Sequence, residues 1–230
     1  MLWSNFWGSV HCLGSFYYCM ACRLPQGESL IAPPSQCPNC HQRLKIKDLV
    51  PIVSVLFLRF RCRYCKAKIP WSSLCAEVVF GFMFVKITNL PIFSQQLLAF
   101  CWLSCAFILS FTDILYLILD PFVFFSGSEL LWFLAFCTGL TFYPMHFIVL
   151  LLLCIVGHFS SQHYLGQGDL LLACAWFPWL TLEQISMLLV VASGSGILYL
   201  LLKYCLCHQP FAPIPFIPFM TLGLYISYFW

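Results

Sequence analysis

Tyr164-Leu165-Gly166-Gln167-Gly168-Asp169-Leu170-Leu171-Leu172 is the stretch from which the fold can be argued, because it carries a G-x-G-D motif directly into an apolar run. A carboxylate at membrane depth is costly, and it is usually retained for function or beside a partner. Asp113, in Leu109-Ser110-Phe111-Thr112-Asp113-Ile114-Leu115, is the comparable residue, since it also lies between apolar segments. Two isolated aspartates of this kind predict a pair that acts together.

The composition indicates a membrane protein. Of the 230 residues, 62% are hydrophobic and 8% are charged, whereas about 25% of residues are charged in an ordinary soluble domain. We therefore expect an all-α polytopic membrane protein embedded in the lipid bilayer, and the composition excludes a soluble globular domain.

Positive charge is concentrated in one loop. Nine of the eleven Lys and Arg residues lie between positions 23 and 68, together with two acidic residues, which gives this stretch an excess of seven positive charges. By the positive-inside rule the loop is expected to be cytoplasmic, which places the N-terminus outside. A short loop between membrane spans accounts for this charge, so no nucleic-acid partner is expected.

Hydropathy predicts about eight transmembrane helices. Seven apolar segments cover 3–22, 72–90, 95–112, 145–160, 169–181, 184–206 and 212–229. Residues 114–143 contain Asp120-Pro121 and a Ser-Gly-Ser-Glu stretch, so they form either a kinked span or a short loop followed by a span. No Lys or Arg precedes the first segment, which is therefore expected to remain in the mature protein.

The expected domains are a first transmembrane helix (1–22), a cytoplasmic basic loop (23–70) and a multi-helix membrane domain (71–230). With two crossings between them, Asp113 and Asp169 would lie on the same side of the membrane as the loop. Ala192 and Gly196, four residues apart, predict a contact between helices.

Four cysteines have the spacing of metal ligands. Cys37-Pro38-Asn39-Cys40 and Cys62-Arg63-Tyr64-Cys65 are two Cys-x-x-Cys pairs with 21 residues between them. Each pair can bracket a metal ion in one tight turn, so the four thiolates of Cys37, Cys40, Cys62 and Cys65 could bind a structural Zn²⁺. Unmetallated thiols and redox chemistry are the alternatives. His41 could substitute as a ligand, but with four cysteines present it is expected to be a surface residue.

Two adjacent carboxylates cannot both ionise cheaply, so such a pair tends to share a proton. One member is then a base for water and the other an acid for a carbonyl or a leaving amine, which is aspartic-protease chemistry. Gly166 and Gly168 lack Cβ atoms, so they would allow a tight turn and let a substrate backbone approach Asp169. The alternative is structural, because an Asp that caps a helix after a glycine-rich turn is common.

Taken together, these motifs resemble the type IV prepilin peptidases, and the resemblance runs nearly end to end. The matching segments are Gly14-Ser15-Phe16, Arg23-Leu24-Pro25, Cys37-Pro38-Asn39-Cys40, Asp48-Leu49-Val50-Pro51-Ile52-Val53-Ser54, Arg61-Cys62-Arg63-Tyr64-Cys65, Trp71, Glu77, Asp113, Gly166-Gln167-Gly168-Asp169 and Pro215-Phe216-Ile217-Pro218-Phe219. The chain departs from the family pattern at Tyr18, Phe60, Ser73-Leu74, Asp120-Pro121 and Leu171. None of these departures removes a candidate catalytic aspartate.

The resemblance implies a membrane aspartic protease with Asp113 and Asp169 as its catalytic dyad and a zinc-binding cytoplasmic loop. It implies cleavage of a short basic leader, after a glycine, from prepilin-like precursors at the cytoplasmic face of the bacterial cell membrane. It also implies methylation of the new N-terminus with S-adenosylmethionine as the methyl donor, for which no binding residues are assigned.

Two other functions remain open from the residues alone. Asp113 and Asp169 could be relay carboxylates of a proton- or ion-coupled transporter. The chain could also be a catalytically silent membrane scaffold whose zinc module binds a partner. Transport predicts acidic residues spread along the depth of the bundle, whereas both aspartates are expected at one face.

Overall fold

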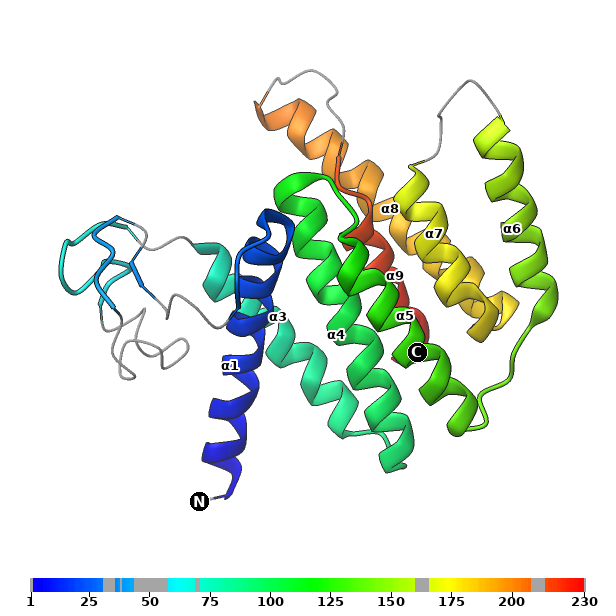
Figure 1. The fold of residues 1–230 in the computed structure, drawn as a ribbon, viewed down its shortest axis with the longest axis horizontal. Helices are drawn as coiled ribbons and strands as arrows, with labels where there is room; N and C mark the ends of the chain where they lie inside the picture. Colours follow the sequence, from blue (N-terminus) through cyan, green and yellow to red (C-terminus); the bar gives the residue numbers. More distant parts are fainter. Residues whose placement is uncertain are drawn as a thin grey trace. The chain divides into compact units, whose positions relative to one another are not determined.

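The computed structural model describes residues 2–30, 36–37, 39–43, 58–68, 71–159, 166–207 and 214–229. Within these ranges the secondary structure consists of eight α-helices, two short 3-10 helices and two isolated β-bridges (Figure 1). The predicted all-α fold is confirmed. The chain divides into two compact units, Met1–Leu90 and Pro91–Trp230, here called unit 1 and unit 2. The functional division at positions 22 and 70 stays a prediction.

Unit 1 contains α1 (Leu2–Arg23), η1 (Leu24–Gln26), the cysteine loop and α3 (Trp71–Thr88). The two long helices are antiparallel, because Gly14 of α1 lies against Ala76 and Phe80 of α3 while Tyr18 reaches Ser72. A Cβ atom at position 14 would lie 2.8 Å from the Ala76 carbonyl oxygen, so only glycine permits this approach. The Tyr18 and Ser72 hydroxyls form a hydrogen bond of 2.7 Å.

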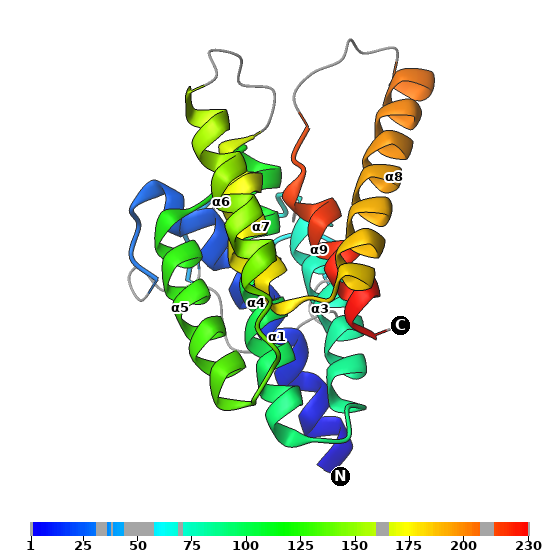
Figure 2. The same cartoon turned by 90° about the vertical axis from the view of Figure 1, so that its right-hand side faces the viewer.

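Unit 2 contains α4 (Phe93–Tyr116), α5 (Pro121–Cys137), α6 (Pro144–Phe159), α7 (Gln167–Trp176), η3 (Phe177–Trp179), α8 (Leu182–Cys207) and α9 (Ile217–Phe229). Helix α4 is the central helix, since it contacts both α5 and α9. Within its most apolar stretch of 18 residues 67% is buried, against 22% for the corresponding stretch of α8. Helix α9 contacts both α4 and α8, and α6 contacts α7 (Figure 2). The core of unit 2 therefore follows α4 and α9.

The contact between α8 and α9 depends on small residues. A Cβ atom at Gly223 of α9 would lie 2.5 Å from the Leu188 carbonyl oxygen of α8. Farther along α8, Ala192 is fully buried and Gly196 faces the Phe219 ring, where a Cβ atom would make an ordinary contact of 3.7 Å. The predicted helix contact at Ala192 and Gly196 is confirmed.

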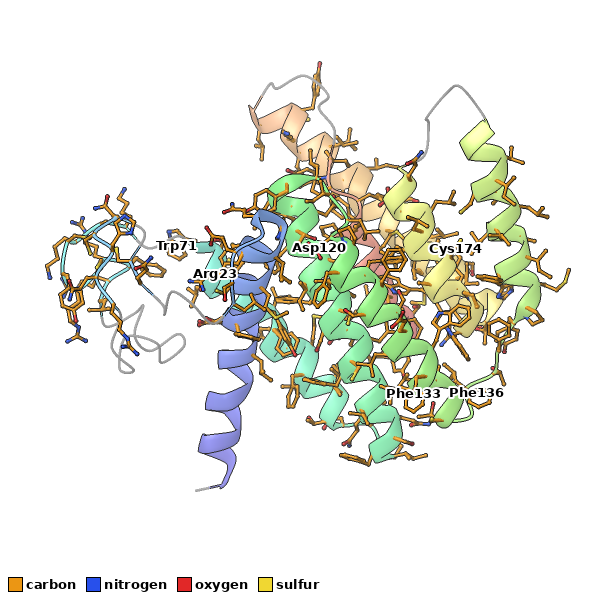
Figure 3. The ribbon with its side chains drawn as sticks, viewed as in Figure 1. Arg23, Trp71, Asp120, Phe133, Phe136 and Cys174 are labelled. Carbon is orange, nitrogen blue, oxygen red and sulfur yellow. The ribbon has the colours of Figure 1, made fainter. Side chains whose placement is uncertain are left out.

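Residues 114–143 form a short loop followed by a helix, and the alternative of one kinked span is wrong. Helix α4 ends at Tyr116, and the C-cap residue Leu117 has a left-handed backbone with φ 55° and an N–H that donates to the Asp113 carbonyl oxygen at 2.9 Å. Asp120 then begins α5, because its Oδ1 accepts from the Val123 N–H at 3.0 Å and Pro121 occupies the first helical position (Figure 3). Proline fits there because that N–H has no partner within the helix.

Among the described residues, three helices are long and apolar enough to cross a membrane: Trp71–Thr88, Phe93–Tyr116 and Leu182–Leu206. The apolar helices Pro121–Cys137, Pro144–Val156 and Ile217–Phe229 are shorter. Helix α7 has ten residues, which gives it a length of about 15 Å, roughly half of a ~30 Å hydrocarbon core. The membrane character is confirmed, and the exact number of crossings stays a prediction.

Candidate active site

Asp113 lies in the last turn of α4 and is 8% exposed. Its Oδ2 accepts a hydrogen bond from the backbone N–H of Ile217, at a distance of 3.0 Å. Ile217 is the first residue of α9, whose leading N–H groups have no partner within their own helix. The carboxylate of one helix therefore caps the N-terminus of another, although the two residues are 104 positions apart in the chain.

Asp169 lies in the first turn of α7, three residues after Gly166, which occupies the N-cap position. Its carboxylate folds back over that glycine, because a Cβ atom at position 166 would lie 2.6 Å from Asp169 Oδ2. Gly166 has φ −58°, a value that any residue can adopt. The glycine thus leaves space for the Asp169 carboxylate in this position, which a Cβ atom would force to move, and its backbone freedom is not used. A negative side chain in the first turn also interacts favourably with the helix dipole.

Gly168 has a different neighbour. A Cβ atom at this position would lie 3.2 Å from Leu119 Cβ, so the loop between α4 and α5 packs directly on the start of α7. At the other end of α7 the Trp132 indole N–H of α5 donates to the Ala175 carbonyl oxygen at 3.1 Å. Together these contacts fix α7 along α5, and they bring Asp169 to the end of α4 that carries Asp113.

The two carboxylates line one cavity of about 590 Å³, and Asp113 acts on Asp169 by direct electrostatic interaction. The cavity wall is mainly apolar and includes Leu117, Phe124, Phe125, Leu171, Ile214 and Phe216. Leu117 stands at this wall in the left-handed conformation, which costs a residue with a Cβ atom about 1–2 kcal/mol. The predicted pair is therefore brought to one cavity, in surroundings that favour the sharing of one proton between the two carboxyl groups.

The four predicted metal ligands also come together, in unit 1. The sulfur atoms of Cys37, Cys40, Cys62 and Cys65 all lie within 4.8 Å of one another, and the Cys37 and Cys65 sulfurs are 3.7 Å apart. Four thiolates around a Zn²⁺ ion at a Zn–S distance of about 2.3 Å are separated by roughly 3.8 Å. The arrangement fits a tetrahedral metal ion.

The two cysteine pairs have the same backbone geometry. In the first, the His41 N–H donates to the Cys37 carbonyl oxygen at 2.8 Å, and in the second the Lys66 N–H donates to that of Cys62 at 3.0 Å. His41 and Lys66 both have left-handed backbones, with φ 54° and 59°. His41 is exposed and lies outside the four-sulfur cluster, in agreement with the prediction that it is a surface residue.

The surroundings of two of the thiols favour the thiolate form that binds metals. Hydrogen bonds from the Ala67 backbone and the Asn39 side chain lower the pKa of Cys65 to about 6. Backbone hydrogen bonds from Cys40 and Asn39 lower the pKa of Cys37. Since a metal must displace protons from its thiol ligands, these donors favour binding at Cys37 and Cys65. Burial and the neighbouring Cys65 and Cys37 thiols instead raise the pKa of Cys40 to about 11.

Sequence reasoning missed the partner of Asp113. The segment Pro215-Phe216-Ile217-Pro218-Phe219 was recognisable as a family motif, but no pattern in it shows that a backbone N–H of Ile217 meets the carboxylate. The only usable signal is the pair of prolines, which lack N–H groups and so leave few free donors at this helix start.

Comparisons with known proteins find one group of relatives. The family described as "Bacterial Peptidase A24 N-terminal domain" matches residues 9–90. The prepilin leader peptidase/N-methyltransferase of Pectobacterium carotovorum subsp. carotovorum is 30% identical over 204 residues, which cover 83% of this chain and 72% of the relative. Proteins of the same name from Burkholderia pseudomallei and Bacillus subtilis are also similar to this chain.

The Burkholderia pseudomallei protein is 30% identical over 217 residues, covering 87% of this chain and 68% of its own length. The Bacillus subtilis protein is 35% identical over 108 residues, and the match spans 46% of this chain and less than half, 44%, of that relative. No solved structure matches the chain. Because identity of 30% extends over more than two thirds of two such relatives, the chain belongs to the prepilin leader peptidase/N-methyltransferase family.

Proposed function

We propose that this protein cleaves the basic leader from prepilin-like precursors at the cytoplasmic face of the bacterial cell membrane, with Asp113 and Asp169 as an aspartic dyad. The observation that carries the proposal is that both carboxylates line one cavity of about 590 Å³ and interact with each other. The names of the relatives supply the reaction class.

The mechanism follows from a shared proton. One carboxylate acts as the general base that activates a water molecule, and the protonated partner donates a hydrogen bond to the carbonyl of the scissile peptide bond. The partner then protonates the leaving amine. The mainly apolar wall of the cavity lowers the local dielectric, which strengthens the electrostatic interactions beside it.

We further propose that the four-cysteine cluster binds a structural zinc ion. When bound, the ion would cross-link the two Cys-x-x-Cys turns and contribute folding free energy to the loop. Methylation of the new N-terminus, with S-adenosylmethionine as donor, is proposed on the relatives' names alone, and no residue is assigned to the donor.

The dyad is tested by single replacements that keep the shape of each side chain. Asp113→Asn and Asp169→Asn should each lower leader cleavage by at least about 10³-fold, because an amide cannot exchange the proton. The double variant should be no worse than either single one, since the two residues act as a unit. Cleavage of a co-expressed prepilin in membranes is the measurement.

Asp120→Asn is the matched control. Asp120 is also a buried aspartate, but its side chain caps α5, and asparagine caps a helix about as well as aspartate. This variant should cleave normally. Full cleavage by Asp169→Asn, or loss of cleavage in Asp120→Asn alone, would refute the dyad and favour the transporter, for which proton flux in vesicles is the alternative measurement.

A further inference from the structure

We propose that the first turn of α9 is the positioning element of Asp113, with the backbone N–H of Ile217 as the group that holds its carboxylate. The inference rests on the proposed function, because it gives Asp113 a mechanical support that the dyad chemistry requires. It adds a functional role for a segment outside the two aspartate motifs.

The donors at the start of α9 are few. Pro215 and Pro218 have no N–H, and the Phe219 and Met220 N–H groups donate to the Phe216 carbonyl oxygen at 3.0 and 3.1 Å. The N–H groups of Phe216 and Ile217 remain, and both interact with the Asp113 carboxyl group. The bond from Ile217 measures 3.0 Å. The prolines thus leave few free donors at this helix start, and the Ile217 N–H is bound to the Asp113 carboxylate.

This contact is buried on both sides. Ile217 is 2% exposed and Asp113 is 8% exposed. A hydrogen bond to a charged group is stronger than one between neutral groups, and more so where water is scarce. The partial positive charge at the N-terminus of α9 acts in the same direction. Both effects favour one fixed position of the Asp113 carboxylate.

A second contact fixes α9 along α4. One turn before Asp113, the Ser110 hydroxyl forms a buried hydrogen bond of 2.7 Å with the Thr221 hydroxyl, which lies one turn after Ile217. The Ser110 hydroxyl lies 2.7 Å from the Ala106 carbonyl oxygen and the Thr221 hydroxyl lies 3.3 Å from it, so one hydroxyl donates to this carbonyl while the other donates to its neighbouring hydroxyl. Two polar contacts one turn apart define both the rotation and the height of α9. The Ile217 N–H therefore cannot slide past the carboxylate.

Positioning of this kind has a kinetic consequence. A catalytic group misplaced by about 1 Å can cost on the order of 10²-fold in rate. Phe216 and Ile217 also line the cavity, so a side-chain replacement there could change substrate binding as well. The test must therefore remove the N–H itself and must separate kcat from KM.

The experiment compares Ile217→Pro with Ile217→Val in the purified full-length protein. The substrate is a synthetic prepilin-type peptide with a basic leader, a glycine at the cleavage site and an apolar segment. Proline is well suited to the first position of a helix, so Ile217→Pro removes the donor and keeps the helix start. We expect its kcat to fall roughly 10- to 100-fold below that of Ile217→Val, the range for a lost charge-assisted hydrogen bond. KM should be the same for the two variants within about twofold, because the change acts on the catalytic carboxylate.

Leu182→Pro is the matched control, since Leu182 is the exposed first residue of α8. It should leave both kcat and KM unchanged. If Ile217→Pro does not fold, replacement of the same residue by its α-hydroxy analogue removes the N–H without the proline ring, and the same loss of kcat is expected.

The outcomes are distinguishable. Equal kcat values for Ile217→Val and the variant that lacks the N–H would overturn the inference while the dyad stands, provided that Asp113→Asn is inactive. Equal cleavage by Asp113→Asn and the unmodified protein would overturn the proposed function, and this inference with it.

Discussion

Gly223→Ala is the substitution for which the structure gives the clearest magnitude. The added Cβ atom would lie 2.5 Å from the Leu188 carbonyl oxygen and 3.1 Å from the Leu188 Cα atom. Ordinary contacts of a Cβ atom begin at 3.4 Å. The obstructing atoms belong to the backbone of α8, so no rotamer change can remove them, and the two helices must separate by about 1 Å.

Overpacking of this kind typically costs about 1–3 kcal/mol, and the rigid backbone neighbour favours the upper half of that range. The higher helix propensity of alanine returns up to ~1 kcal/mol. We therefore expect a net loss of about 1–2 kcal/mol, or roughly 2–8 °C in melting temperature for a chain of this size. Leader cleavage should fall as well, because α9 also carries the N–H that contacts Asp113.

Gly194→Ala is the matched control on the other helix of the pair. No atom lies within 4 Å of a Cβ atom at position 194, so only the gain in helix propensity applies. This variant should melt about 2–4 °C above the unmodified protein. The measurement is thermal unfolding of the purified proteins in one detergent. If both variants shift the melting temperature in the same direction, α8 and α9 do not meet at Gly223 and the packing argument is wrong.

The remaining predictions concern the cysteine loop. Purified protein should contain one zinc ion per chain by elemental analysis. Cys62→Ser should lower both the zinc content and the yield, because ligation by four thiolates contributes directly to folding. Protein that folds without stoichiometric zinc would contradict this prediction. Lys66→Gly should slow zinc loss to a chelator, because glycine removes left-handed strain of about 1 kcal/mol. Lys68→Gly, outside the residues with positive φ, should not slow it, and equal effects of the two changes would refute the strain argument.

The helices could be predicted from the sequence because each apolar segment is long and has few charged residues to interrupt it. The ambiguous part was 114–143, where Asp120-Pro121 allowed either a kink or a new helix start. In the structure Asp120 starts a new helix, because its carboxylate accepts a hydrogen bond from the Val123 N–H. Hydropathy gives no information on such a local contact. The brevity of α7 was also missed, since the predicted segment 169–181 merges it with the turn Phe177–Trp179.

The candidate site was predictable to the extent that its residues are chemically unusual. Lone aspartates in apolar surroundings and two Cys-x-x-Cys pairs are conspicuous in a sequence with 8% charged residues. The support of the site is different, because the Ile217 N–H and the Gly223 backbone contact are main-chain features. Such features carry no side-chain signature, and only the packing of distant helices reveals them.

The cap that Asp113 provides for α9 has an evolutionary consequence. If Asp113 serves the proposed reaction, its carboxylate both takes part in catalysis and caps the start of α9. The residue is then under two selective pressures, and relaxing one does not release it. In a descendant that had lost peptidase activity, position 113 would still be held to aspartate or asparagine, since both accept the Ile217 N–H. Position 169, whose carboxylate folds back over Gly166 at the start of its own helix, would be free to drift first.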